Sequence, residues 1–326
     1  MSFRRMIFFT GILAVIFLII GCEGDQGPAG PEGTATCVEC HSDDTQIVAI
    51  SAQWDNSTHA TGGNFERNSS DCSRCHTSEG FVAYLDTGEG GTPENPSAIG
   101  CFTCHMPHTN HDFSLRTTDP VELTLGGTFD QGHGNLCANC HQGRTPSPEI
   151  PESGTITITS TRFGVHHGPQ ANILMGSGAY VFAGASYGSS HGPNVSDGCP
   201  TCHMASPYGV QAGGHTWDLV YLYHGGDTDL VEGCNISECH NGNVDDFEHG
   251  DVQADIQALL LTLSDILIND VGIMNESEQS VAGDWPVAAA GAFLNYKMIL
   301  EDRSLGIHNP AYVEDVLNAS IAAVSS

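Results

Sequence analysis

Lysine is nearly absent from this chain, and basic residues as a class are scarce. The 326 residues include nine Lys and Arg against 39 Asp and Glu, a formal net charge of -30, and Lys297 is the single lysine. Proteins that bind nucleic acid neutralise phosphates with clusters of basic side chains, so this composition excludes nucleic acid as a partner. An acidic surface favours basic proteins or cations, although the same charge also keeps a protein soluble without any partner.

The apolar run near the start of the chain is too short to be a typical membrane span. Residues 6–20 follow Arg4 and Arg5, and a membrane-spanning helix needs about 20 apolar residues. A basic start followed by a short apolar stretch is typical of an export signal. The sequence therefore predicts a signal peptide over residues 1–21.

Gly21 and Cys22, which follow this run, resemble the lipobox of bacterial lipoproteins. The resemblance implies cleavage before Cys22 and lipidation of that residue, and lipid chains anchor a protein to a membrane without spanning it. The alternative is an ordinary cysteine. Residues 22–36 contain a short Gly-x-y run with too few triplets for a triple helix, which predicts a Gly/Pro-rich spacer.

The other twelve of the 13 cysteines fall into six motifs, five of them Cys-x-x-Cys-His and one Cys-x4-Cys-His. In such a motif two cysteines form thioethers to a c-type haem, and the adjacent histidine ligates the iron from one face. The sequence therefore predicts six covalent haem c groups, each with its iron. The motifs are Cys37-Cys40-His41, Cys72-Cys75-His76, Cys101-Cys104-His105, Cys137-Cys140-His141, Cys199-Cys202-His203 and Cys234-Cys239-His240.

Disulfides and structural zinc are the alternatives for paired cysteines. Neither explains why a histidine follows the second cysteine of every pair. The longer sixth motif resembles the expanded loops of small tetrahaem cytochromes, which supports a haem site there as well.

The other face of each iron decides between electron transfer and catalysis. Of 17 histidines, eleven lie outside the motifs, enough to give every haem a second histidine. Two histidine ligands close the iron to substrates and suit electron transfer, whereas an open position suits catalysis.

Several segments around these histidines resemble the multihaem cytochrome superfamily that includes ammonia-forming nitrite reductase and hydroxylamine oxidoreductase. The segments are residues 54–60, 101–108, 166–170, 190–191 ahead of 199–204, 214–217 and 306–310. The resemblance implies that the distal ligands are His59, His108, His166 or His167, His191, His215 and His308. For each of them a surface or hydrogen-bonding role is the alternative, and the reserve candidates are His111, His133, His224 and His249.

The expected fold class is mainly α, with extensive irregular loops and few short strands. Glycine-rich turn clusters predict a loop-rich hexahaem region over residues 37–250, with short hairpin strands at 121–125 and 155–161. Apolar residues at helical spacing predict a helical module over residues 251–326, with His308 as a helix-borne ligand. This module packs against the haem region or, alternatively, forms a contact in a homo-oligomer.

We therefore predict an electron carrier rather than an enzyme. It would pass electrons between redox protein donors and acceptors in anaerobic respiration. Its lipid anchor would hold it in the periplasm or at the outer membrane or cell surface. The nitrite-reductase branch has a Cys-x-x-Cys-Lys motif, whereas every motif here ends in His. One alternative is a reductase of nitrite, hydroxylamine or a sulfur oxyanion with one open haem, and another is a subunit of a haem filament or porin-cytochrome complex.

Overall fold

The computed structural model describes residues 45–62, 64–110 and 112–325. The described residues form one compact unit. The predicted signal peptide, Cys22, the spacer and the first motif (Cys37, Cys40 and His41) all lie outside the described residues. Within the described part, no helix combines the length and apolar character that crossing a membrane requires.

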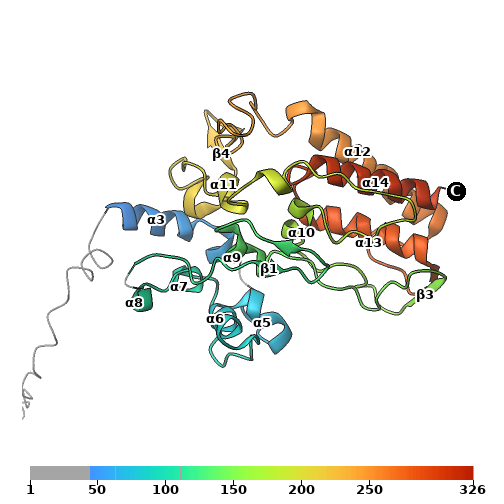
Figure 1. Ribbon diagram of the computed structural model, residues 1–326, viewed down its shortest axis with the longest axis horizontal. Coiled ribbons are helices and arrows are strands. Elements are labelled where there is room, and N and C mark those ends of the chain that lie inside the picture. Colours follow the sequence, from blue (N-terminus) through green and yellow to red (C-terminus); the bar gives the residue numbers. More distant parts are fainter. Residues whose placement is uncertain (1–44, 63, 111, 326) are drawn as a thin grey trace, which may run out of the picture. The chain divides into compact units, whose positions relative to one another are not determined.

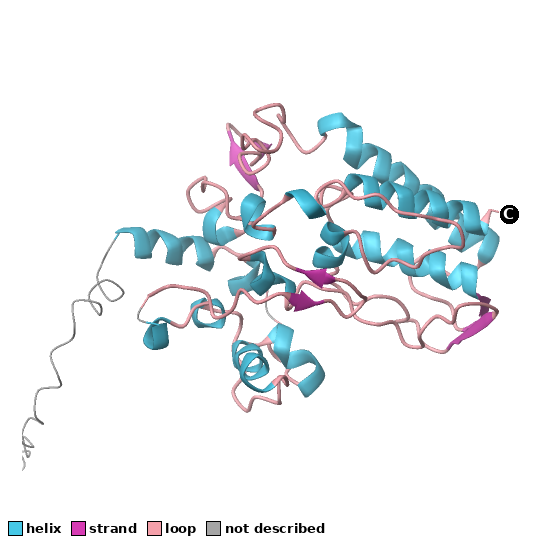
Figure 2. Cartoon of the chain, viewed as in Figure 1, coloured by secondary structure: helices cyan, strands magenta, loops and turns pink. Residues whose placement is uncertain are grey.

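Short helices separated by long loops make up most of the chain before residue 252 (Figure 2). These helices are α3 (Thr45–Asp55), α4 (Thr58–Thr61), α5 (Ser70–His76), α6 (Ser78–Thr87), α7 (Cys101–Cys104), α8 (Pro107–Asn110), α9 (Gly134–Ala138), α10 (Gln170–Met175) and α11 (Cys199–His203). The 3-10 turns are η1 (Gly192–Asn194), η2 (Gly214–Thr216) and η3 (His249–Asp251).

Local capping explains where some of these short helices begin and end. The Thr77 hydroxyl accepts a hydrogen bond from the backbone N–H of Gly80 at 2.9 Å, which caps the start of α6. Gly88, with a φ of 82°, ends α6 in the left-handed conformation that glycine adopts without strain. Ser57 caps α4 in the same way as Thr77, with the N–H of Ala60 as donor at 3.2 Å, and α4 carries His59.

The strands form three two-stranded antiparallel sheets. β1 (Val121–Glu122) pairs with β2 (Thr128–Phe129), and β4 (Val220–Tyr223) pairs with β5 (Gly226–Asp229), each as a local hairpin. β3 (Thr155–Ile158) pairs instead with β6 (Gly283–Pro286), which joins the loop-rich region to the C-terminal helices.

Three long helices near the C-terminus hold the larger hydrophobic core. α12 (Val252–Asp265) continues into the π-helix η4 (Ile266–Val271), and α14 (Pro310–Val324) lies beside both α12 and α13 (Val287–Asp302) (Figure 1). Leu263, Val313 and Leu317 are fully buried between them. Residues from the loop-rich region, including Ile158 and Ile173, join the same core.

The structure confirms the expected fold class, because it is mainly helical with a few short strands and long loops. The helices expected at the C-terminus are also present. The prediction of a local hairpin at 155–161 is wrong, because β3 pairs with β6, more than 120 residues further along the chain. His308 is not helix-borne: it lies in the turn between α13 and α14.

Candidate haem-binding site

Helical backbone places the two cysteines and the histidine of a motif on one side of the chain. In α5 and α11, the first cysteine, the second cysteine and the histidine occupy positions i, i+3 and i+4, which share one helix face. The N–H of His105 donates to the carbonyl of Cys101 at 2.9 Å, and the N–H of His141 does the same to Cys137. All cysteines of the second to sixth motifs are free thiols.

The longer sixth motif reaches a similar closure without a helix. Its residues lie in consecutive turns, and the N–H of His240 donates to the carbonyl of Cys234 at 3.1 Å. The two additional residues therefore lengthen the loop but return the histidine to the carbonyl of the first cysteine, the same contact that the shorter motifs make.

Each motif histidine that the structure describes faces a histidine from a distant part of the chain. The ring centroids are 6.1 to 6.3 Å apart in these pairs. The pairs are His76 with His166 (6.2 Å), His105 with His215 (6.3 Å), His141 with His59 (6.1 Å), His203 with His308 (6.2 Å) and His240 with His191 (6.2 Å).

This spacing fits two imidazoles on opposite faces of one metal ion. A metal–imidazole bond is about 2 Å long and the bonding nitrogen lies about 1 Å from the ring centre, so two such ligands have centroids about 6 Å apart. Over the described ranges, no group of three or more His, Cys, Asp and Glu side chains could hold a metal ion. Two donors suit a haem, because the porphyrin provides the remaining iron ligands.

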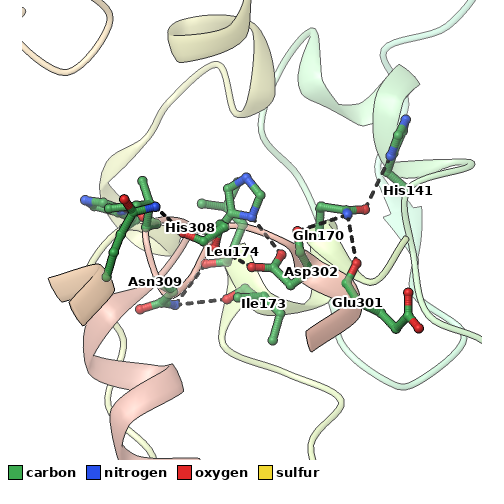
Figure 3. A network of polar contacts seen from close by, with 12 residues as sticks. His141, Gln170, Ile173, Leu174, Glu301, Asp302, His308 and Asn309 are labelled. Carbon is green, nitrogen blue, oxygen red and sulfur yellow. Dashed lines mark hydrogen bonds and ion pairs between the residues drawn. The ribbon is translucent and has the colours of Figure 1, made fainter. Parts of the chain in front are cut away.

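The second nitrogen of several paired rings is already engaged. Nδ1 contacts an acceptor in four of them, which leaves Nε2 for the facing histidine, and metal-bound histidines commonly have such a partner. The acceptors are Gln170 Oε1 for His141 at 3.3 Å, the Ile307 carbonyl for His191 at 2.7 Å, the Trp217 carbonyl for His203 at 2.8 Å and Asp302 Oδ1 for His308 at 2.7 Å. Figure 3 shows His141 and His308 with their partners.

Burial keeps most of the paired histidines neutral, the form that binds a metal. Burial, aided by the charge of His141, lowers the pKa of His59 to about 4. Burial, with smaller contributions that begin with Arg144, also lowers the pKa of His166 to about 4. His308 differs: burial lowers its pKa, but the charge and hydrogen bond of Asp302 outweigh burial and leave the pKa raised.

Thiol contacts place four of the motifs side by side. Cys75 of the second motif makes a side-chain hydrogen bond with Cys140 of the fourth. Two further contacts link the fourth motif to the fifth and the fifth to the sixth, and they are Cys137 with Cys199 and Cys202 with Cys234. Four motifs therefore form a continuous series of neighbours.

Trp217 contacts histidines that belong to the pairs of the third, fourth and fifth motifs. Its ring is edge-on to His59 at 4.7 Å and to His215 at 5.6 Å, and its carbonyl binds His203 Nδ1. Its backbone has a φ of 56°, a left-handed conformation that is uncommon outside glycine.

The two histidines that the sequence left as alternatives have different surroundings. His166 faces His76, whereas His167 contacts Glu301 Oε2 through Nδ1 at 2.5 Å and is largely exposed. His108 lies 5.6 Å from Phe102, and the first-motif histidine that it would be expected to face, His41, is not among the described residues.

The reserve histidines also have defined places. His133 pairs with Asp197 at 2.9 Å, and the ring of His224 lies 4.1 Å from Tyr223. His249 lies 5.7 Å from His240, so the sixth motif has a second histidine neighbour besides His191. His111 lies outside the described ranges.

Sequence reasoning missed Asp302, Gln170 and Trp217, which contact the paired histidines. Trp217 was visible only as part of a segment around His215. Gln170 likewise appeared only as the last residue of the segment that begins at His166. Asp302 precedes His308 by six residues with no recognised motif between them, so neither pattern nor spacing indicated it.

Comparisons with known proteins give one structural likeness. No family model and no curated protein matches the chain. The crystal structure of the outer cell wall cytochrome OcwA matches with a TM-score of 0.50 and 20% sequence identity, over 83% of this chain and 49% of that one. The chain has a multihaem cytochrome-like fold. It spans about half the length of that cytochrome.

Proposed function

We propose that this protein is an exported hexahaem c-type cytochrome that transfers electrons. The observation that carries the proposal is the set of histidine pairs, each joining a motif histidine to a second histidine at a centroid distance of 6.1 to 6.3 Å. The free motif thiols and the cytochrome-like fold support the same conclusion.

In this proposal the chain holds each haem by four side chains. Two cysteines would attach it, and the motif histidine and the paired histidine would both bind its iron. His59, His166, His191, His215 and His308 are the distal ligands of the described motifs, and His108 serves the first motif. When bound, haem supplies one-electron redox chemistry.

The protein's contribution is spacing, ligand orientation and exclusion of substrates from the irons. A second histidine ligand for each iron would exclude nitrite or another substrate from the iron. The thiol contacts between the second, fourth, fifth and sixth motifs support close neighbouring haems along the chain. Close neighbours suit stepwise electron transfer.

The setting of this electron carrier is proposed on the sequence together with the structural likeness. A signal peptide and lipidated Cys22 would hold it at a membrane outside the cytoplasm, and its neighbour in fold is an outer cell wall cytochrome. Redox proteins would be its donors and acceptors in anaerobic respiration, and the electrons would finally reach an extracellular acceptor. The strong negative charge favours partners with basic surfaces.

Intact mass and electron paramagnetic resonance (EPR) test the proposal on the full-length protein from a host that matures c-type cytochromes. We expect the mass of the processed chain plus six haems, and only low-spin ferric signals in the oxidised protein. The Cys234→Ser/Cys239→Ser variant should lose one haem and keep the others. Absence of covalent haem would refute the cofactor assignment, and a full-stoichiometry high-spin haem that binds cyanide would refute the assignment of two histidines to every iron.

A further inference from the structure

The turn between α13 and α14 contacts paired histidines of two motifs, and the end of α13 is linked to a third motif through Gln170. It contains His308, which faces His203, and the Ile307 carbonyl, which accepts the hydrogen bond of His191 Nδ1. Gln170 extends the same network: its Oε1 contacts His141 Nδ1 at 3.3 Å, and its Nε2 donates to the Asp302 carbonyl at 3.2 Å (Figure 3).

Asn309 fixes this turn against the loop-rich region. Its side chain is fully buried, and its amide nitrogen donates to the carbonyls of Ile173 and Leu174 at 3.2 and 3.0 Å. These carbonyls belong to the last turn of α10, whose carbonyl groups lack partners within the helix. Asn309 Oδ1 accepts the N–H of Ser190, next to His191, at 2.8 Å.

The Nδ1 partner of His308 is Asp302, the last residue of α13, and it differs in charge from the Nδ1 partners of the other paired histidines. Asp302 is 2% exposed, its Oδ1 lies 2.7 Å from His308 Nδ1, and its Oδ2 accepts a hydrogen bond from the Ser304 hydroxyl. The acceptors that contact His141, His191 and His203 are a side-chain amide and backbone carbonyls, all of them neutral. Among the described histidine pairs, His308 is the member whose Nδ1 partner is a carboxylate.

A buried carboxylate on an axial histidine changes the electron affinity of the iron. A hydrogen bond to an ionised acceptor is stronger than one between neutral groups, and it makes the ligating ring more basic. A more electron-rich ligand and a nearby negative charge both stabilise the ferric state, and the charge acts strongly where water is excluded. Hydrogen bonds around the ligands are a recognised way for a protein to set a haem potential.

We propose that Asp302 is a positioning residue that lowers the reduction potential of the haem attached at Cys199 and Cys202 below the potentials of the haems attached at the fourth and sixth motifs. This inference rests on the proposed electron-transfer function. As a consequence, the reduction potential changes along the series of haems. The haem of the fifth motif stays oxidised after the haems of the fourth and sixth motifs have been reduced. Electrons then cross it without being stored there.

The test is a potentiometric titration of the full-length holoprotein followed by EPR. In Asp302→Asn, a neutral amide replaces the carboxylate, and we expect one midpoint potential to rise while the others keep their values. Glu301→Gln is the matched control, because Glu301 is the adjacent carboxylate but contacts His167 and Lys297 rather than a paired histidine. The control should leave every midpoint unchanged.

Ser304→Ala provides a second variant that keeps the carboxylate. Removing the Ser304 hydroxyl leaves more negative charge on the oxygen that binds His308, so the same midpoint should fall rather than rise. Opposite shifts of one haem in the two variants would support the proposal. Where Asp302→Asn folds poorly, a fall of that one midpoint in Ser304→Ala would still support it, and an unchanged midpoint would overturn it.

Two results would overturn the proposal. One is a set of unchanged midpoints in Asp302→Asn with the low-spin signals intact, and the other is an equal rise of all midpoints, which indicates a general field effect. Failure of the proposed function has a different signature, because the unmodified protein would then lack covalent haem or contain a full-stoichiometry high-spin haem that binds cyanide.

Discussion

His166 and His167 are adjacent in the chain but should respond differently to the same substitution. The ring of His166 lies 6.2 Å from that of His76, so His166→Ala would remove the proposed distal ligand of the haem of the second motif. That haem should become high-spin. Because the chain carries six attachment motifs, the expected change is one haem in six, with the other five remaining low-spin.

His167→Ala should leave all haems low-spin. Its side chain is 69% exposed and contacts Glu301, and a surface ion pair of this kind contributes at most about 1 kcal/mol to stability. The expected effect is a small loss of stability without a spectroscopic change. The two variants therefore separate a ligand from a surface histidine at neighbouring positions of one loop.

Low-temperature EPR of the oxidised proteins measures this difference, with cyanide added to detect an open iron. Intact mass serves as the control, since both variants keep Cys72 and Cys75 and should carry the same number of haems. A His166→Ala protein with only low-spin signals would refute the assignment of His166. A high-spin haem in His167→Ala would reverse the two roles.

Three further predictions follow from other contacts. Trp217→Ala should alter the low-spin EPR signals of more than one haem, because its ring contacts two proposed ligands. Trp285→Ala is the control and should leave the EPR signals unchanged, because the Trp285 indole donates to a backbone carbonyl. His191→Ala should produce one high-spin haem and His249→Ala none, and the reverse result would assign His249 to the sixth motif. Leu317→Ala should lower the free energy of unfolding by about 2–5 kcal/mol, measured by denaturant titration, because the side chain is fully buried.

The sequence predicted the parts of this protein that depend on local pattern. The Cys-x-x-Cys-His and Cys-x4-Cys-His motifs are short and contiguous, so their histidines are predicted as proximal haem ligands from the sequence alone, and that assignment stays a prediction. The C-terminal helices follow from apolar periodicity over long segments, and α13 and α14 lie where that periodicity placed them.

Contacts between distant residues could not be predicted in the same way. His203 and His308 are 105 positions apart, and their approach depends on how α13 and α14 pack against the loop-rich region. The choice of His166 over His167 depends on side-chain direction within a loop that has no repeating pattern. The pairing of β3 with β6 likewise depends on the core beneath both strands, not on a turn signal.

The histidine pairs also have a consequence for how the chain resists unfolding. Each iron held by both members of a pair would cross-link the chain as a disulfide does, and the joined residues are as far apart as His59 and His141 or His105 and His215. A cross-link that closes a loop of about 100 residues removes conformational entropy worth about 4.7 kcal/mol from the unfolded chain. Unlike a disulfide, an iron–histidine bond is not broken by thiol reductants. Much of the resistance to unfolding would then be gained when the irons bind, which suits a chain whose loop-rich region has few buried apolar side chains of its own.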